Sequence, residues 1–499
     1  SVTPQSPRDL ESPEQAAVRP SAVGSVSISL HGSSILGSVA NSVGSVGGSV
    51  ALSPRTGRTI TRPLSPSRIR RRPRMSMGPF GSEAGQVNSG DEETEAIRSR
   101  LCEVVCEAAS VKMGHSDVAE LRAIRDRVVQ ALDAAAAMGL PDAELQPAEC
   151  QRRRLHNMLQ ETKGHIRVYC RVRPMSSQER SRGDSEVLRV IDDTALEMSA
   201  NNAFSFSGVY TSDSTQEEIF EDCKDLVQCV LDSTNVSVLC YGPSGTGKTY
   251  TMYGTPEAEG IAFRMIRELF DIINAPGLHH QASLSGSLVE LYNNNLFDLT
   301  RPLDQERNVP GLGMRRDNDG VVHVDGLSTH PVRSAAELEA LVTRALEQRV
   351  VAAHALNLES SRSHVLLTVR LTRPGPEPDS APTVSKLTFC DLGGLERLKR
   401  SLADGTQRRQ AIEINKSLTA LGDVIEAVAE KRRHVPYRNH KLTQLLQDSL
   451  GGSAKALMFV NCSPAKSSLG ETSMALKLAT RARGVVNTGA ATNLCSPRM

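Results

Sequence analysis

Apolar side chains recur at helical spacing in two segments ahead of the central part of the chain. In the first segment the apolar positions lie four and three residues apart: Ile97, Leu101, Val104, Ala108 and Val111. The second segment repeats this period after a break at 114–117, with Val118, Leu121, Ile124, Val128, Leu132 and Ala135. This spacing places the apolar side chains on one face of an α-helix, so the pattern predicts two amphipathic helices.

Polar and turn-forming residues mark where these helices begin and end. Asp117 and Glu120 have the spacing of a capping box at the start of the second helix, and 139–141 (Gly-Leu-Pro) ends it. A third helix, rich in arginine at 152–154, runs towards Gly164. A continuous coiled coil needs about three or four heptads in register, and these helices fall short of that. Self-association through 93–163, as a homodimer or with a light partner, therefore stays open.

The composition divides the chain into four parts. Residues 1–92 are rich in Ser, Gly, Pro and Arg and poor in large apolar side chains, which predicts a disordered tail. Residues 93–163 form the helical region. From 164 to 488, β-branched runs alternate with amphipathic helices and turns, which is typical of an α/β domain. Residues 489–499 are a short C-terminal tail.

Charge and composition narrow the classes of partner. The 58 basic and 57 acidic residues nearly cancel, so electrostatic partners must be sought in local patches. One patch at 55–74 holds eight arginines and no acid, and it is either a solvated linker or a docking tail for a polyanion. No apolar run approaches the roughly 18 residues that a membrane helix needs, so we expect no membrane span. With no tryptophan and 3% aromatic residues, few side chains can stack on bases, and we expect no nucleic-acid partner.

A glycine-rich loop supplies the first candidate chemistry. The buried strand expected at 236–240 is followed by the spacing GxxxxGK[ST], which runs from Gly242 to Thr249, and then by a helix. In such a strand–loop–helix unit the glycines permit the turns that direct backbone N–H groups at phosphate oxygens. Lys248 supplies a positive charge, and Thr249 supplies a hydroxyl ligand for Mg²⁺. The loop therefore predicts a nucleoside-triphosphate site.

A second strand ends in residues that complement this loop. The strand expected at 386–391 ends at Asp391, and Gly394 follows in a DxxG arrangement. This arrangement places a carboxylate near Mg²⁺ and a glycine N–H against the γ-phosphate. GTP is disfavoured, because the nearest match to a guanine-reading NKxD element, at 415–418, lacks the aspartate.

Five separated motifs resemble those of kinesin motor domains and occur in the same order. They are YGPSGTGKTYTM at 241–252, NLESSRSH at 357–364, DLGGLERL at 391–398, INKSL at 414–418 and VPYRNHKLTQLLQDSLGG at 435–452. The resemblance covers about 164–488 and implies ATP hydrolysis, with Mg²⁺, coupled to movement on microtubules. It also implies an α/β P-loop NTPase fold with a central, mostly β sheet of about eight strands between two helical layers. The expected location is the cytoplasm, on microtubules of the cytoskeleton, including those of the spindle.

The resemblance implies a role for individual residues. Arg171 and Pro174 resemble residues that pack against adenine and ribose. The nucleotide would be held by the loop residues Gly242, Pro243, Ser244, Gly245, Thr246, Gly247, Lys248, Thr249 and Tyr250, and by Ser360. The two switches would comprise Asn357, Ser360, Ser361 and Arg362 in the first, and Asp391, Gly394 and Glu396 in the second. Thr249, Ser361 and Asp391 would lie near Mg²⁺, and a salt bridge between Arg362 and Glu396 would position the attacking water.

The sequence departs from the usual kinesin motifs at several positions. Gly393 and Leu395 stand where the family usually has Ala and Ser, and 243–246 differ from its usual Gln-Thr-Gly-Ser. Three further positions replace the usual Glu, Asn and Thr: Gln410, Ser453 and Ala456. Leu395 cannot donate or accept a proton. Two functions therefore stay open, namely an ATP-hydrolysing motor and a nucleotide-gated microtubule-binding adaptor with little or no turnover.

The resemblance also indicates the surface that would face tubulin and the branch of the family. Basic residues that resemble the main microtubule contact, or flank the second switch, are Lys399, Arg400, Arg408, Arg409, Lys431, Arg432, Arg433, His434, Arg438 and Lys441. Segment 152–174 closely resembles the neck-to-motor junction of C-terminal-motor kinesins, which are minus-end directed. His165 stands where that branch usually has Asn.

Overall fold

The computed structural model describes most of the chain beyond residue 88. The described residues are 89–112, 117–163, 166–198, 202–275, 282–302, 312–317, 322–355, 360–375, 380–395, 405–451 and 454–484. The chain divides into two compact units, Ser1–Ser82 and Glu83–Met499, and all described residues belong to the second unit. The tails predicted at 1–92 and 489–499 lie almost entirely outside the described residues.

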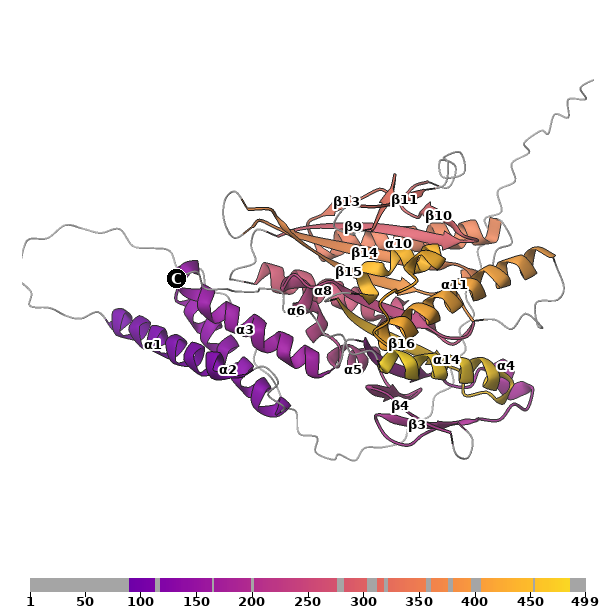
Figure 1. The fold of residues 1–499 in the computed structure, drawn as a ribbon, viewed down its shortest axis with the longest axis horizontal. Helices are drawn as coiled ribbons and strands as arrows, with labels where there is room; N and C mark the ends of the chain where they lie inside the picture. Colours follow the sequence, from indigo (N-terminus) through magenta and orange to yellow (C-terminus); the bar gives the residue numbers. More distant parts are fainter. Residues whose placement is uncertain are drawn as a thin grey trace, which may run out of the picture. The chain divides into compact units, whose positions relative to one another are not determined.

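Three helices pack together around an apolar core of their own: α1 (Ser89–Ser110), α2 (Val118–Ala137) and α3 (Asp142–Thr162) (Figure 1). The core contains the apolar positions that the spacing predicts, except two: Ile97 is partly buried against it, and Val118 is 36% exposed. Asp117 caps α2, because its carboxylate accepts hydrogen bonds from the backbone N–H groups of Ala119 and Glu120 at 2.9 and 3.1 Å. The helices predicted in this region are therefore confirmed, and they form a three-helix bundle.

Helix α3 has two buried faces. Its apolar face belongs to the core of the bundle and consists of Leu145, Ala148, Leu155, Met158 and Leu159. Its second face is polar and consists of Glu149, Arg152, His156 and Gln160. These polar residues are three and four positions apart, so they form one stripe along the helix. The stripe lies against α6 (Asp225–Leu231) and its C-cap residue Asp232.

Ion pairs hold the polar face of α3 in place. Arg152 pairs with Glu149 at 2.7 Å and also with Asp232, and these three residues are 8%, 5% and 3% exposed. Asp225 accepts hydrogen bonds from three side chains at the junction between α3 and the first strand: Gln160 (3.0 Å), Lys163 (2.6 Å) and Arg167 (3.0 Å). The end of α3 is thus attached to the α/β domain by buried or half-buried polar contacts.

The main sheet contains nine strands among the described residues. Its order is β10-β9-β14-β15-β6-β16-β1-β5, and β13 pairs with β9 beside this path. Strands β15, β6, β16, β1 and β5 are parallel, whereas β10, β9, β13 and β14 pair antiparallel. The bounds are β1 Ile166–Val172, β5 Gly208–Tyr210, β6 Val236–Tyr241, β9 Ser283–Tyr292, β10 Asn295–Asp298, β13 His330–Val332, β14 His364–Arg373, β15 Thr383–Asp391 and β16 Lys455–Cys462. The prediction of a mostly β sheet with about eight strands is confirmed.

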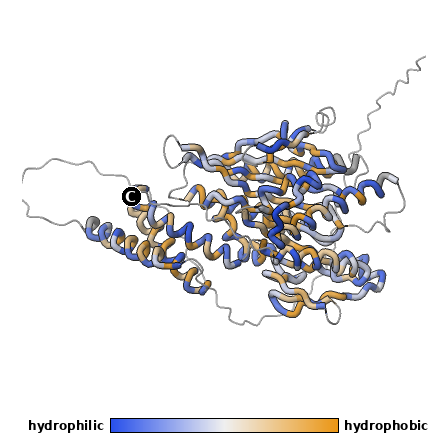
Figure 2. The backbone as a smooth tube through the Cα atoms, viewed as in Figure 1, coloured by the Kyte–Doolittle hydropathy of each residue, from blue (hydrophilic) through white to orange (hydrophobic). Residues whose placement is uncertain are grey.

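Helices cover both faces of this sheet. Along β6, Leu239 and Tyr241 belong to one apolar cluster and Val236, Val238 and Cys240 to another, as expected when successive side chains point to opposite faces. The first cluster includes side chains of α11 (Gly405–Ala429) and α14 (Leu469–Arg483). The second includes side chains of α6, α8 (Ile261–Asn274) and α10 (Ala335–Ala355). Figure 2 shows hydrophobic segments running through the sheet and the helices around it, so the predicted two helical layers are confirmed.

Short elements complete the described part of the chain. Three small sheets are formed by β2 (Leu188–Val190), β3 (Ala195–Met198) and β4 (Ala203–Ser205), by β7 (Gly254–Thr255) and β8 (Ala258–Glu259), and by β11 (Gly313–Arg316) and β12 (Val322–Asp325). The short helices are α4 (Ser177–Ser181), α5 (Gln216–Glu221), α7 (Lys248–Met252), α12 (Lys441–Leu445), α13 (Gln447–Leu450), η1 (Ser360–Arg362), η2 (Tyr437–Asn439) and η3 (Lys466–Ser468). None of the helices in the described ranges is long and apolar enough to cross a membrane.

Candidate nucleotide-binding site

The glycine-rich loop connects the central strand β6 to helix α7, as the sequence predicts. Gly242, Gly245 and Gly247 have φ angles of 149°, 72° and 89°, which side chains with a Cβ rarely adopt. At Gly242 a Cβ would also lie 2.2 Å from the carbonyl oxygen of Asn461 on the neighbouring strand β16. The glycines are therefore required by the shape of the loop and by its close approach to the sheet.

Parallel pairing of β6 with β15 brings the second motif to the same edge of the sheet. Cys240 on β6 is paired with Asp391 on β15, and both strands end there. The hydroxyl of Thr249 donates to Asp391 Oδ2 at 2.6 Å. Lys248 Nζ, on a side chain that is only 7% exposed, donates to the carbonyl oxygens of Gly242 and Pro243 at 3.1 and 2.8 Å. The structure thus unites residues that are about 140 positions apart, with the loop cation beside the carboxylate and hydroxyl.

The pair of Thr249 and Asp391 suits a hydrated Mg²⁺ ion. Asp391 Oδ1 is buried and has no hydrogen-bond partner among the described residues, so one carboxylate oxygen is available to a cation or its water. Burial raises the pKa of Asp391, and this is opposed by Arg349, the hydroxyl of Thr249 and Lys248. A divalent cation would further favour the ionised carboxylate. The residues present therefore fit the predicted metal.

The turn after β15 lies directly against the loop. The backbone N–H of Leu395 donates to Gly242 O at 3.2 Å, and Leu395 forms a parallel bridge with Pro243. The N–H of Gly394 donates to Ser361 O at 2.7 Å. A Cβ on Gly394 would lie 2.9 Å from the backbone N and Cα of Ser244, so only glycine fits. The three predicted phosphate-contacting segments, namely the loop and both switches, therefore meet at Gly394.

Arg171 lies beside Tyr250, which follows the loop on α7. The guanidinium of Arg171 is 5.0 Å from the centre of the Tyr250 ring and donates to Gln216 Oε1 and Thr251 Oγ1, both at 3.0 Å. Burial lowers the pKa of Arg171. The Tyr250 ring is 41% exposed, and Pro174 is exposed as well, so an apolar ring and a proline are available to a planar base. Gln216, which also donates to Tyr250 O at 2.8 Å, is absent from the residues predicted for this site.

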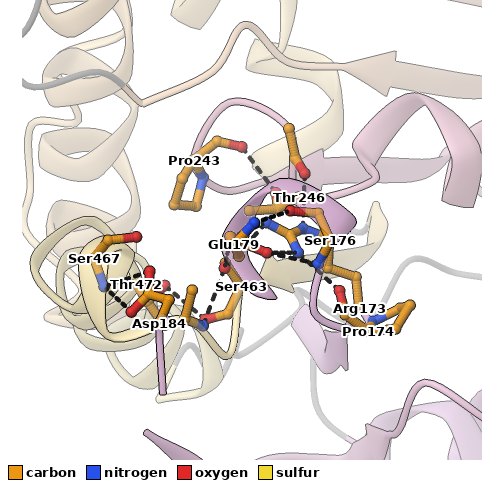
Figure 3. A network of polar contacts seen from close by, with 12 residues as sticks. Arg173, Pro174, Ser176, Glu179, Asp184, Pro243, Thr246, Ser463, Ser467 and Thr472 are labelled. Atoms are coloured by element: carbon orange, nitrogen blue, oxygen red, sulfur yellow. Dashed lines mark hydrogen bonds and ion pairs between the residues drawn. The ribbon is translucent and has the colours of Figure 1, made fainter. Parts of the chain in front are cut away.

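Arg173 binds the backbone of the loop, and the sequence does not predict this contact. Its Nε donates to Gly245 O at 2.8 Å, while Nη1 and Nη2 bind the carboxylate of Glu179 at 2.7 and 2.6 Å (Figure 3). Nη2 also donates to Ser463 Oγ at 3.1 Å. The hydrogen bonds from Arg173 lower the pKa of Glu179 to about 2, although burial opposes this. The only signal in the sequence is the second arginine of CRVRP, which carries no information about its distant partners.

Comparison with known proteins identifies the family. The family model described as the kinesin motor domain matches residues 171–485, which is more than half of the chain. The chain belongs to the kinesin family. Kinesin motor domains are microtubule-stimulated ATPases. The family assignment by motif is therefore confirmed.

Two relatives of this kinesin belong to the KIN-14 branch. "Kinesin-like protein KIN-14E" of Arabidopsis thaliana is 42% identical over 340 residues, which is 67% of this chain and 27% of that protein. "Kinesin-like protein KIN-14I" of Oryza sativa subsp. japonica is 41% identical over 340 residues, with the same two shares. The chain thus spans less than a third of the length of either relative. KIN-14 kinesins form the C-terminal-motor branch, so the predicted branch is confirmed.

A solved structure shares the fold. The structure described as that of "a fast kinesin" is 32% identical to this chain, with a TM-score of 0.60. The match covers 65% of this chain and 93% of that one. The kinesin motor fold is therefore shown by structure as well as by sequence.

The first switch of this kinesin is anchored by buried polar contacts. Arg362 is 7% exposed, and its Nη1 donates to Gln410 Oε1 on α11 at 3.3 Å. Arg349 on α10 donates to Glu290 Oε1 at 3.0 Å and to Ser363 Oγ at 2.9 Å. Ser360 and Ser361 lie in the same short helix η1 as Arg362. Asn357 and Glu396 lie outside the described residues, as do Lys399, Arg400 and Ser453, so their predicted roles stay predictions.

The basic surface predicted for tubulin extends along α11, the loop after it and α12. The exposed basic residues there are Arg408, Arg409, Lys431, Arg432, Arg433, His434 and Arg438, and Lys441 is half-buried. Arg438 and Lys441 line one pocket together with Lys416 of α11. Arg432 pairs with Glu426 and Glu430 at 2.9 and 2.6 Å, so part of its charge is neutralised within the chain. Arg408 and Arg409 lie near the start of α11, and the other exposed cations follow its end, so the basic residues are spread along the length of this helix.

Proposed function

We propose that this chain is an ATP-hydrolysing microtubule motor that binds ATP with Mg²⁺ at the loop 242–250. The observation that carries the proposal is the 2.6 Å contact between Thr249 Oγ1 and Asp391, beside the buried cation of Lys248 and with Asp391 Oδ1 unpaired among the described residues. This combination of hydroxyl, carboxylate and lysine at the end of two parallel strands is what a Mg²⁺-bound triphosphate requires.

Each group has a distinct task in the proposed reaction. Tyr250 and Pro174 take the base, while Lys248 and the loop amides bind the β- and γ-phosphates. Mg²⁺, when bound, neutralises phosphate charge and orients the phosphates. The oxygen of a water attacks the γ-phosphorus as the bond to the bridging β–γ oxygen breaks, and ADP leaves with that electron pair. The Gly394 amide, which donates to Ser361 O in the structure, would donate to the γ-phosphate instead.

The proton of the attacking water needs an acceptor. By resemblance, Glu396 takes this role, held by Arg362, which lies in η1 next to Ser361. Leu395 replaces a serine that could have relayed the proton. Its side chain is 8% exposed and belongs to the apolar core, so it excludes water from this side of the turn. We therefore propose hydrolysis through Glu396 without a relay by residue 395.

The test is the steady-state ATPase activity of the full chain with and without microtubules. We expect turnover to rise as microtubules are added and to be lost in Lys248→Ala, which lacks the cation for the phosphates. The alternative is a nucleotide-gated microtubule-binding adaptor. Nucleotide-dependent co-sedimentation with microtubules, combined with no ATP cleavage in a single-turnover experiment, would establish the adaptor and contradict the motor.

We further propose that movement is towards the minus end and that the α1–α3 bundle acts as the lever. Support comes from the KIN-14 relatives and from α3, which leads into β1 and lies against α6. A lever of this kind needs rigidity, and the bundle has an apolar core of its own. Gliding of polarity-marked microtubules over surface-bound protein tests the direction, and plus-end-directed gliding would contradict the proposal.

The neck of this chain is proposed to be monomeric. The apolar face of α3, which a coiled-coil partner would need, is covered by α1 and α2 of the same chain. A homodimer or a light partner through 93–163 would have to displace these helices. Light scattering of the full chain at micromolar concentration should give the monomer mass, and a dimer mass would favour self-association. The proposed place of work is the microtubule cytoskeleton.

A further inference from the structure

His364 connects three segments that belong to different parts of the motor. It is the first residue of β14, two positions after Arg362, and its side chain is only 2% exposed. Its Nδ1 accepts a hydrogen bond from the backbone N–H of Gly393 at 3.0 Å. Its Nε2 lies 2.7 Å from Ser417 Oγ on α11. One imidazole ring therefore contacts the second switch with one nitrogen and α11 with the other.

The partners of His364 fix its tautomer. A backbone N–H can only donate, so Nδ1 must carry a lone pair and the ring proton must reside on Nε2. Nε2–H then donates to Ser417 Oγ, and that hydroxyl donates to Ile414 O at 2.6 Å. Burial lowers the pKa of His364 to about 3, helped by His440, Arg349 and Lys248, so the ring is neutral at physiological pH. Hydrogen bonds thus run in one direction, from Gly393 through the ring to the backbone of α11.

The hydrogen bonds of His364 reach the nucleotide site because Gly393 is next to the proposed γ-phosphate donor. Gly393 immediately precedes Gly394, whose N–H faces Ser361 O at 2.7 Å and is the proposed donor to the γ-phosphate. A Cβ on Gly393 would lie 3.4 Å from Cε1 of His364, so the ring is in close contact with this turn. Ser417 is 1% exposed, so neither end of the connection can exchange its partner for water. A planar ring between two buried partners keeps the distance between turn and helix fixed.

We infer that His364 is a positioning residue that makes the second switch and helix α11 move together, and so couples microtubule contact to the arrangement of Gly394. Helix α11 carries Arg408 and Arg409 on its exposed surface and leads to the basic loop at 431–434. A displacement of α11 at this surface is transmitted to Gly393 through the direct hydrogen bonds of Ser417 and the His364 ring. This inference rests on the proposed microtubule-stimulated ATPase activity.

The test compares two serines whose hydroxyls are equally buried. Ser417→Ala removes the acceptor of His364, whereas Ser385→Ala removes a hydroxyl that donates to Val230 O at 2.7 Å, away from the switches. Ser385 is 2% exposed, so both variants remove a buried hydroxyl. Ser417→Ala also leaves the ring N–H of His364 without its acceptor, whereas Val230 O keeps the backbone N–H of Ser233 as a donor, so Ser417→Ala should lose more thermal stability. The readout is the ratio of microtubule-stimulated to basal turnover. We expect Ser417→Ala to lower this ratio about tenfold, which corresponds to about 1.4 kcal/mol, and Ser385→Ala to keep the wild-type ratio.

Variants of the ring itself extend the test. His364→Phe removes both hydrogen bonds and should lower the ratio at least as far as Ser417→Ala. The double variant should be no worse than His364→Phe, because both substitutions interrupt one connection. His364→Asn retains an acceptor for the Gly393 N–H and should recover part of the ratio.

The outcomes separate this inference from the function on which it rests. A wild-type protein without any microtubule stimulation contradicts the proposed ATPase itself. A stimulated wild type with equal ratios in Ser417→Ala and Ser385→Ala contradicts only the coupling role of His364. The same holds if His364→Phe lowers basal and stimulated turnover by the same factor, because His364 would then support the pocket alone.

Discussion

The backbone N–H of Leu395 donates a hydrogen bond to the carbonyl oxygen of Gly242 at 3.2 Å, so the second switch is attached to the phosphate loop through main-chain atoms. The adjoining bridge pairs Leu395 with Pro243, and both positions depart from the usual kinesin motifs. Since the attachment uses no side-chain atom, it tolerates the change from serine to leucine. The apolar side chain adds burial at a place where a hydroxyl would need a partner.

Leu395→Ser should therefore lower the free energy of unfolding without lowering the rate of ATP cleavage. Leu395 is 8% exposed within the apolar core, so the substitution should cost about 2 kcal/mol of unfolding free energy. We expect the single-turnover rate of ATP cleavage with microtubules to stay the same or rise, because the main-chain contact with Gly242 persists. If the wild type does not cleave ATP and Leu395→Ser does, the chain is a nucleotide-gated adaptor and the proposed motor activity is wrong.

Alanine substitutions at two adjacent glycines should lower turnover to very different extents. In Gly394→Ala the new Cβ would lie 2.9 Å from the backbone of Ser244, so the loop and the switch must separate and the Gly394 donor moves. We expect microtubule-stimulated turnover to fall roughly 100-fold, the usual effect of losing one donor to a transition state. Gly393→Ala is the matched control. Its Cβ would meet neighbours only at 3.4 Å, and turnover should change less than about threefold. Equal losses in both variants would contradict the assigned role of Gly394.

The phosphate loop could be predicted from sequence because its requirements are local. Glycine at 242, 245 and 247 follows from backbone angles, and the spacing to Lys248 and Thr249 follows from the turn into a helix. The helices of the bundle could be predicted for the same reason, since their apolar spacing depends on nearby residues only.

Contacts between distant segments could not be predicted in this way. Arg173 and Ser463 are 290 positions apart, and nothing in the spacing of either indicates a shared support for Gly245. The polar face of α3 appears in the sequence as an arginine-rich helix, which is usually solvated. Its burial depends on Asp232, 80 positions after Arg152. The sequence left self-association through this helix open because the fold-back of α1 and α2 onto α3 is a tertiary event.

Acid should loosen the contact between α3 and α6 through His156. Its Nε2 lies 3.3 Å from Cys229 Sγ, and burial lowers its pKa from 6.5 to about 4. Asp232 and Asp225 oppose this shift, while Arg152 and Arg125 add to it. Because the folded pKa is depressed, the unfolded chain binds the proton first, so stability present above pH 6.5 is lost as the pH falls towards 4.

The matching measurement is urea unfolding at pH 7 and pH 5, comparing wild type with His156→Gln. Glutamine keeps a donor for Cys229 but does not titrate. We expect the wild type to lose about 1–2 kcal/mol more than the variant between these two values. An identical loss in both proteins would mean that His156 is not the group that titrates.

Asp232→Asn should release α3 from α6 while leaving the bundle intact. The carboxylate is one of two acids that neutralise the buried Arg152 guanidinium, and Glu149 is the other. Because Glu149 still neutralises Arg152, the loss is that of one charge-assisted contact, about 2 kcal/mol, which corresponds to a change of roughly 30-fold in an opening equilibrium. Amide hydrogen exchange should therefore accelerate in α6 but not in α1 or α2, whose packing does not involve Asp232.

Glu144→Gln is the matched control, because it breaks an exposed pair with Arg98 at 2.8 Å, in which the two side chains are 39% and 44% exposed. Such a pair contributes little, and exchange in α6 should stay at the wild-type rate. Unchanged exchange in Asp232→Asn would show that the contacts of Asp225 with Gln160, Lys163 and Arg167, and not the ion pair of Asp232, hold the neck against the motor.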